Sequence, residues 1–158
     1  MRSRRALRIA AFVALAAAPL AVTEEGRADV SLENARSIQA IQGVLARAER
    51  EVGEACKTTV AIVVDWDSFG NERRAILGVT SGGVTPAADA LKGACVDDLG
   101  RQRVAHAVHQ IALRYVADPS KRRLALAAGV LALEAPFGGD AKDTFSTERV
   151  RIYIEKTL

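Results

Sequence analysis

The sequence is poor in aromatic and sulfur-containing residues, and it contains only two histidines. Aromatic residues make up 4% of the 158 positions, and there are two cysteines, one methionine and one tryptophan. So few aromatic side chains predict a core of aliphatic residues and alanine, which alone supplies 30 positions. A charged fraction of 26% beside 49% apolar residues excludes a disordered tail and is typical of one globular domain. The abundance of alanine and arginine is typical of a bacterial genome rich in G and C.

The N-terminal apolar segment is too short for a comfortable membrane span, which needs about 20 residues. It covers residues 9–22, is interrupted only by Pro19, and follows a start that is rich in arginine. A basic start, a short apolar middle and small residues after it predict a secretory signal peptide over residues 1–28. A membrane anchor or an N-terminal core helix is the alternative. We expect an exported protein, periplasmic or secreted, with one domain over residues 29–158 and no stable membrane anchor after cleavage.

Excess charge is also lacking once the signal peptide is removed. The whole chain has a net charge of +3, but residues 29–158 hold 17 of the 22 basic and 17 of the 19 acidic residues. Nucleic-acid binding requires a basic surplus, so we expect no nucleic-acid partner. A role at an anionic membrane surface loses its support for the same reason.

The motifs of several enzyme classes are missing from the sequence. There is no GxSxG nucleophile elbow, no phosphate-binding loop and no dinucleotide fingerprint. We therefore expect no cofactor. The leading hypothesis is a small non-enzymatic module that binds a protein, a peptide or a small apolar ligand.

The two cysteines, Cys56 and Cys95, allow one intramolecular pairing. Disulfides persist outside the cytosol, and a redox or metal pair commonly shows closer sequence spacing than these two residues do. We predict a structural disulfide between two helices, because Cys56 ends one helical pattern and Cys95 lies on the apolar face of the next. Two buried free thiols are the alternative.

Hydrophobic periodicity predicts the main elements of the N-terminal half. Apolar residues recur at steps of three or four across residues 31–55, which predicts a long amphipathic helix with Ser31 as its N-cap. Residues 58–66 are mostly β-branched and predict a strand. Thr85 and Pro86 have the pattern of an N-cap and first residue of a second helix.

The C-terminal half predicts further strands and one helix. Residues 74–79 could form a short return strand, and residues 109–117 fit either a strand or a helix, with alternation favouring the strand. Apolar runs on both sides of residues 128–129 predict a hairpin. Val150, Ile152 and Ile154 would suit a terminal strand, but Ser146 as an N-cap favours a terminal helix. The expected class is α+β: a long N-terminal helix and one or two further helices packed on a small, mostly antiparallel sheet, with one interhelix disulfide.

One alternative hypothesis is a small metal-assisted hydrolase. His106 and His109 would share one face of a helix that ran through both, and they could ligate a metal. Asp65 or Asp67 would have to supply a further ligand. If a strand begins near residue 109, this pair of histidines separates.

Two aromatic residues near the end of the first predicted strand are candidates for ligand or partner binding. Trp66 and Phe69 lie in a stretch of turn-forming residues. Alternation along the strand favours a buried Trp66, with Asp65 and Asp67 on the opposite face. The alternative is an exposed Trp66 that anchors a partner, since aromatic residues are enriched at interfaces.

Overall fold

The computed structural model describes residues 31–158, so the predicted signal peptide lies outside the described residues. The chain begins with α1 (Leu32–Cys56), a helix of 25 residues. The hydroxyl of Ser31 accepts a hydrogen bond from the backbone N–H of Asn34, which confirms the predicted N-cap. Leu45 and Val52 belong to the buried stripe of this helix. Within residues 31–158, no helix is both long enough and apolar enough to cross a membrane.

In the part of the chain that the structure describes, four strands form a single mixed sheet. They are β1 (Ala61–Asp65), β2 (Gln110–Tyr115), β3 (Arg123–Ala127) and β4 (Val130–Ala135), in the spatial order β1-β2-β4-β3. The β1–β2 and β2–β4 pairs are parallel, and only β3–β4 is antiparallel. The prediction of a mostly antiparallel sheet is therefore wrong: two of the three strand pairs are parallel, because β2 lies between β1 and β4. The hairpin at residues 128–129 is as predicted, and Ala128 and Gly129 both have positive φ, as a tight primed turn requires.

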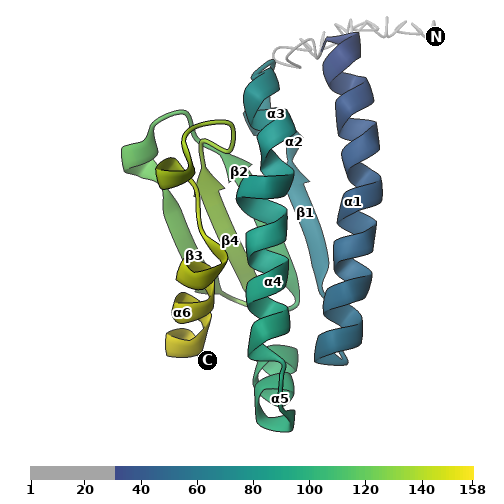
Figure 1. The fold of residues 1–158 in the computed structure, drawn as a ribbon, viewed down its shortest axis with the longest axis vertical. Coiled ribbons are helices and arrows are strands. Elements are labelled where there is room, and N and C mark those ends of the chain that lie inside the picture. The colour runs from purple at the N-terminus through teal and green to yellow at the C-terminus, as the bar shows by residue number, and fades with distance from the viewer. Residues whose placement is uncertain (1–30) are drawn as a thin grey trace, which may run out of the picture.

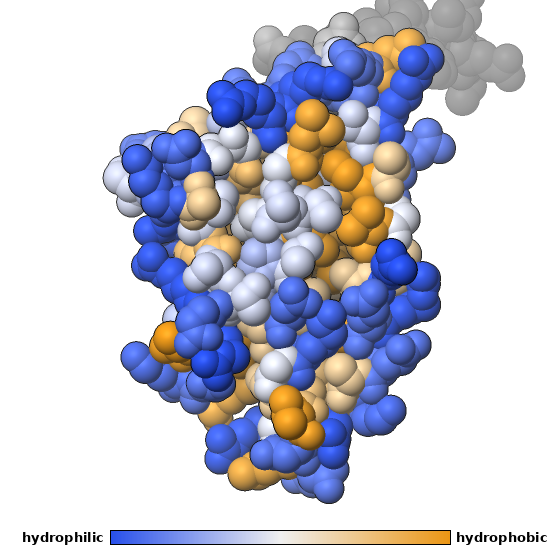
Figure 2. All heavy atoms as spheres, in the orientation of Figure 1, coloured by the Kyte–Doolittle hydropathy of each residue, from blue (hydrophilic) through white to orange (hydrophobic). Residues whose placement is uncertain are grey.

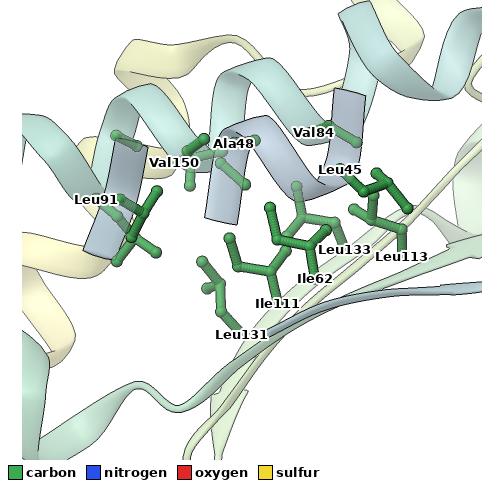
Figure 3. Packing of buried hydrophobic residues seen from close by; sticks show 14 of the residues in the cluster. Leu45, Ala48, Ile62, Val84, Leu91, Ile111, Leu113, Leu131, Leu133 and Val150 are labelled. Carbon is green, nitrogen blue, oxygen red and sulfur yellow. The ribbon is translucent and has the colours of Figure 1, made fainter. Parts of the chain in front are cut away.

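The helices that cover the sheet lie on one side of it. Figure 1 shows α1, α4 (Thr85–Ala94) and α6 (Thr147–Thr157) side by side in front of the strands. In Figure 3 the labelled side chains of the strands point toward the helix side chains, and together they fill the core. The strand contribution is aliphatic: Ile62, Ile111, Leu113, Leu131 and Leu133. The Ser146 hydroxyl accepts from the backbone N–H of Arg149, which confirms the N-cap of α6.

The predicted disulfide is present. The sulfur atoms of Cys56 and Cys95 are bonded, and both residues are almost fully buried. Cys56 is the last residue of α1, and Cys95 is the C-cap of α4. The bond therefore joins the C-terminal ends of the two helices. The α+β class, the long first helix and the interhelix disulfide are confirmed.

The segment between β1 and α4 differs most from the sequence-based prediction. It holds α2 (Trp66–Phe69), α3 (Arg73–Val79) and a π-helical turn at Thr80–Val84 that runs directly into α4. The return strand predicted for residues 74–79 is wrong, because Ala75, Ile76 and Val79 are buried at helical spacing. With α5 (Asp98–Ala107) and α6, five further α-helices accompany α1 within residues 31–158, where we expected one or two.

Thr85 is consequently an interior helical residue and not an N-cap. The Gly82–Gly83 pair has the composition of a loop, yet it lies inside the helix for a packing reason. A β-carbon on Gly83 would lie 2.8 Å from the ring of Phe137, so the absence of side chains lets the helix approach the segment after β4. This close approach joins segments that are far apart in the sequence, so local sequence patterns cannot predict it.

Candidate functional site

The four candidate metal ligands are not brought together. His106 lies near the end of α5, and His109 directly precedes β2, where its carbonyl oxygen accepts from the N–H of Ala61. Asp65 ends β1, and Asp67 belongs to α2. Since β1 and β2 are parallel, the histidines lie at the amino end of these strands and the aspartates at the carboxyl end. Among residues 31–158, no group of three or more His, Cys, Asp or Glu side chains could hold a metal ion.

The two candidate aromatic residues belong to a cluster at the carboxyl end of the sheet. Phe69 is 1% exposed and stacks on Phe137, with ring centroids 5.9 Å apart. Trp66 is half-buried and contacts Phe69 at 5.4 Å between centroids, so it is neither fully in the core nor a free anchor. Burial raises the pKa of Tyr115, which packs on the same ring, and the nearby Glu72 carboxylate raises that pKa further.

A groove with a basic rim lies between α6 and the edge strand β3. Its volume is about 320 Å³. Three of its lining side chains are cationic, and none is acidic: Arg122, Arg149 and Lys156. The other lining residues are apolar or aromatic: Leu124, Phe145, Ile152 and Tyr153. The groove thus places an apolar wall beside a local concentration of positive charge, on a domain whose basic and acidic residues are equal in number.

Both arginines of this groove lie close to the same aromatic ring. The guanidinium carbon of Arg122 lies 5.6 Å from the ring centroid of Phe145, and that of Arg149 lies 6.0 Å from it. Arg122 also donates hydrogen bonds to the carbonyl oxygens of Lys142 and Thr144. Among the ion pairs of the described residues, none involves either arginine.

Charge is separated across the surface of α6. On the side away from the groove, Arg151 donates hydrogen bonds to the carboxylates of Glu148 and Glu155 at 2.8 Å. The hydrogen bond with Glu148 is the main reason why the pKa of Arg151 is raised. Arg151 is paired with two glutamates, whereas no ion pair among the described residues involves Arg149. Because both arginines belong to α6, they form a matched pair for mutagenesis.

The second surface of interest is the side of the sheet opposite the helices, which we call the open face. Its residues alternate with the core residues along every strand. Val63 is 47% exposed, and the other members of the open face are exposed or half-buried. The helix side, in contrast, is the one drawn in Figure 2, where hydrophilic groups surround smaller hydrophobic areas.

Comparison with family models, with curated proteins and with solved structures finds no match for this chain. The groove and the open face therefore have to be interpreted from their own geometry.

Sequence reasoning missed the groove because its residues come from three separate segments. Arg122 precedes β3, Phe145 lies in the loop before α6, and Lys156 lies near the end of α6. One signal was available: the stripe Arg149, Ile152, Tyr153 and Lys156 follows helical spacing on one side of the predicted terminal helix.

Proposed function

We propose that the protein is an exported, non-enzymatic binding module whose ligand is an amphipathic anion. Such a ligand has a carboxylate or a similar acidic group on a hydrocarbon or aromatic body. The observation that carries this proposal is the groove beside Phe145, which combines three cationic side chains with an apolar wall and has no acidic lining residue.

Export is supported by the N-terminal sequence pattern and by the disulfide, which is typical of proteins outside the reducing cytosol. Intact-mass measurement of protein recovered from its native host tests this part. We expect the first 21 to 28 residues to be missing, as the sequence pattern predicts. A mature pool that retains Met1 would contradict export by this signal.

The chemistry of the groove suits a ligand with two different ends. Guanidinium groups bind carboxylates through paired charge-assisted hydrogen bonds, and Arg149 is free of an acidic partner among the ion pairs described above. The hydrocarbon body would lie along the accessible apolar lining, which is Leu124, Ile152 and Tyr153, since Phe145 itself is only 3% exposed. Because Arg122 is already held by two carbonyl oxygens and a ring, ordering this side chain on binding costs little entropy.

Laurate is a suitable probe, because it has one carboxylate and a flexible apolar chain. At about 0.3 kcal/mol per heavy atom, a ligand of this size has a Kd on the order of 1 mM. Titration of isotope-labelled protein, followed by NMR below the micelle concentration of laurate, can measure an affinity in this range. We expect the largest shifts in α6 and in the loop that carries Phe145. Dodecanol, which lacks the charge, should bind more weakly.

Two substitutions in α6 separate groove binding from a general charge effect. Arg149→Gln removes a cation from the groove, and Arg151→Gln removes one from the opposite side of the same helix. We expect Arg149→Gln to raise the Kd for laurate up to about 5-fold, which corresponds to about 1 kcal/mol, the upper end of the range for an exposed ion pair. Arg151→Gln should leave the Kd nearly unchanged. Equal effects of both substitutions, or no saturable binding, would overturn the proposal.

A further inference from the structure

The open face is organised in three rows that cross all four strands. The strand register places Ala61, Gln110, Val130 and Ala127 in the first row, at the amino end of β1. The middle row is Val63, Ala112, Ala132 and Ala125. The third row, at the carboxyl end of β1, is Asp65, Arg114, Glu134 and Arg123. The open face thus has small apolar side chains at its centre and charged side chains along one end.

The charged row alternates in sign from strand to strand. Its order from β1 to β3 is negative, positive, negative, positive. The first pair is in contact, with the Nε of Arg114 at 3.7 Å from a carboxylate oxygen of Asp65. Cross-strand neighbours of opposite sign stabilise a sheet. The alternation also makes the row complementary to a second copy of itself. When the second copy runs in the opposite strand order, every negative side chain faces a positive one.

We propose that the open face binds a second copy of this chain, sheet against sheet, around a twofold axis that runs parallel to the strands between β2 and β4. That rotation places β1 of one copy over β3 of the other, and β2 over β4, without shifting the rows along the strands. Asp65 then faces Arg123 of the second copy, and Arg114 faces Glu134 of the second copy. By symmetry each pair occurs twice, so every charge in the row meets its opposite.

Other registers lack this complementarity. A twofold axis that passes along β2 would place Arg114 against Arg114 of the second copy. An axis along β4 would place Glu134 against Glu134 of the second copy. An axis perpendicular to the strands would bring the charged row over the uncharged row at the other end of the sheet. The usual angle of about 30° between packed sheets displaces the outer strands by only about 4 Å, which long arginine side chains can follow.

The middle row permits the two sheets to approach closely. Ala112 would face Ala132 of the second copy, and Val63 would face Ala125 of the second copy. Packed sheets usually lie about 10 Å apart because larger side chains fill the space between them. Alanine on both sides leaves little volume to fill, so the backbones can come nearer and exclude water from the centre.

Both edges of the sheet are protected against the competing mode of association. The side chain of Glu49 accepts a hydrogen bond from the N–H of Ile62 on β1, at 2.7 Å. The hydroxyl of Tyr153 accepts one from the N–H of Leu126 on β3, at 2.9 Å. A side chain therefore occupies a donor on each edge strand, which hinders pairing with another sheet edge. Edge-to-edge pairing is therefore disfavoured relative to association through the open face.

The size of the face predicts a weak dimer. Four strands at about 4.8 Å spacing and five residues at about 3.3 Å rise cover roughly 320 Å² on each copy. A standard stable interface buries about 800 Å² on each partner. We therefore expect a dissociation constant on the order of 0.1 to 1 mM at low salt, and weaker association as salt screens the charged row.

A charge-swap series measured by sedimentation tests this arrangement with the disulfide-bonded protein at about 0.5 mM and about 20 mM salt. The unaltered protein should show a concentration-dependent mass between monomer and dimer. Arg114→Glu would place two acidic side chains opposite each other at both pairs, so the dissociation constant should rise at least 10-fold. The double variant Arg114→Glu with Glu134→Arg restores opposite signs across the interface and should dimerise again.

The control is Arg36→Glu, which makes the same charge change at an exposed position on α1. It should dimerise like the unaltered protein. A monomer at all concentrations, or association that Arg114→Glu leaves unchanged, would overturn the proposal; so would a double variant that stays monomeric while retaining its circular dichroism spectrum. Laurate binding reports on a different surface, so its loss would affect the proposed function and leave this test intact.

Discussion

Breaking the disulfide is the perturbation whose effect on stability can be worked out most directly. Cys56 and Cys95 are separated by 39 positions, so the bond closes a loop of about 40 residues in the unfolded chain. The chain-entropy relation gives about 13 cal/mol/K for such a loop, or about 4 kcal/mol at 25 °C. A domain of this size has a total stability of about 5 to 15 kcal/mol, so the bond supplies a large share of it.

Comparing reduction with mutation separates two contributions to stability: the crosslink itself and the packing of the cysteine side chains in the core. Both residues are almost fully buried, so replacing them by alanine removes core volume as well as the bond. Urea unfolding of the unaltered protein, with and without reductant, isolates the crosslink; we expect a loss of roughly 3 to 4 kcal/mol and a steeper transition, because the reduced chain exposes more surface.

The double variant Cys56→Ala with Cys95→Ala should lose somewhat more stability and should not respond to reductant. A loss below about 1 kcal/mol on reduction would refute the loop argument. Two titratable thiols in the unreduced, unfolded protein would show that the bond does not form in solution.

The remaining predictions concern one glycine and the single tryptophan. A β-carbon on Gly78 would collide with the backbone carbonyl of Phe137, so Gly78→Ala should cost roughly 2 to 4 kcal/mol in urea unfolding, whereas Gly43→Ala, which has open space, should stabilise α1 by up to about 1 kcal/mol. If Gly78→Ala and Gly43→Ala change the free energy of unfolding equally, the close approach of α3 to the backbone of Phe137 is wrong. Half-buried Trp66 should emit at intermediate wavelength and shift to the red on unfolding, and Trp66→Ala should cost about 2 kcal/mol, half the value for a buried tryptophan; fully red, quenchable emission in the folded protein would contradict this packing.

The elements that the sequence predicts well are those that local chemistry determines. Ser31 and Ser146 both have a hydroxyl at an N-cap position, followed by an amphipathic pattern, and both helices begin where expected. The hairpin at Ala128–Gly129 follows from a small turn between two apolar runs. For residues 109–117 the sequence fits either a strand or a helix and favours the strand. The strand is confirmed, since β2 covers Gln110–Tyr115.

The pairing of the strands could not be predicted, because it depends on contacts between distant segments. β2 lies between β1 and β4 in parallel, with α5 forming part of the connection from β1, and nothing in the local pattern specifies this order. The Gly82–Gly83 pair reads as a loop until Phe137 is placed beside it. The charged row of the open face exists only once the register is known, which is why its alternation is invisible along the sequence.

The position of bound laurate tests the proposed function most directly. Intermolecular nuclear Overhauser effects between laurate methylene protons and the ring protons of Tyr153 or the methyl groups of Leu124 and Ile152 would place the ligand in the groove between α6 and β3, which is the expected result. Contacts to the methyl groups of Val63 and Ala132 instead would place the ligand on the open face and contradict the assignment of the groove as the binding site.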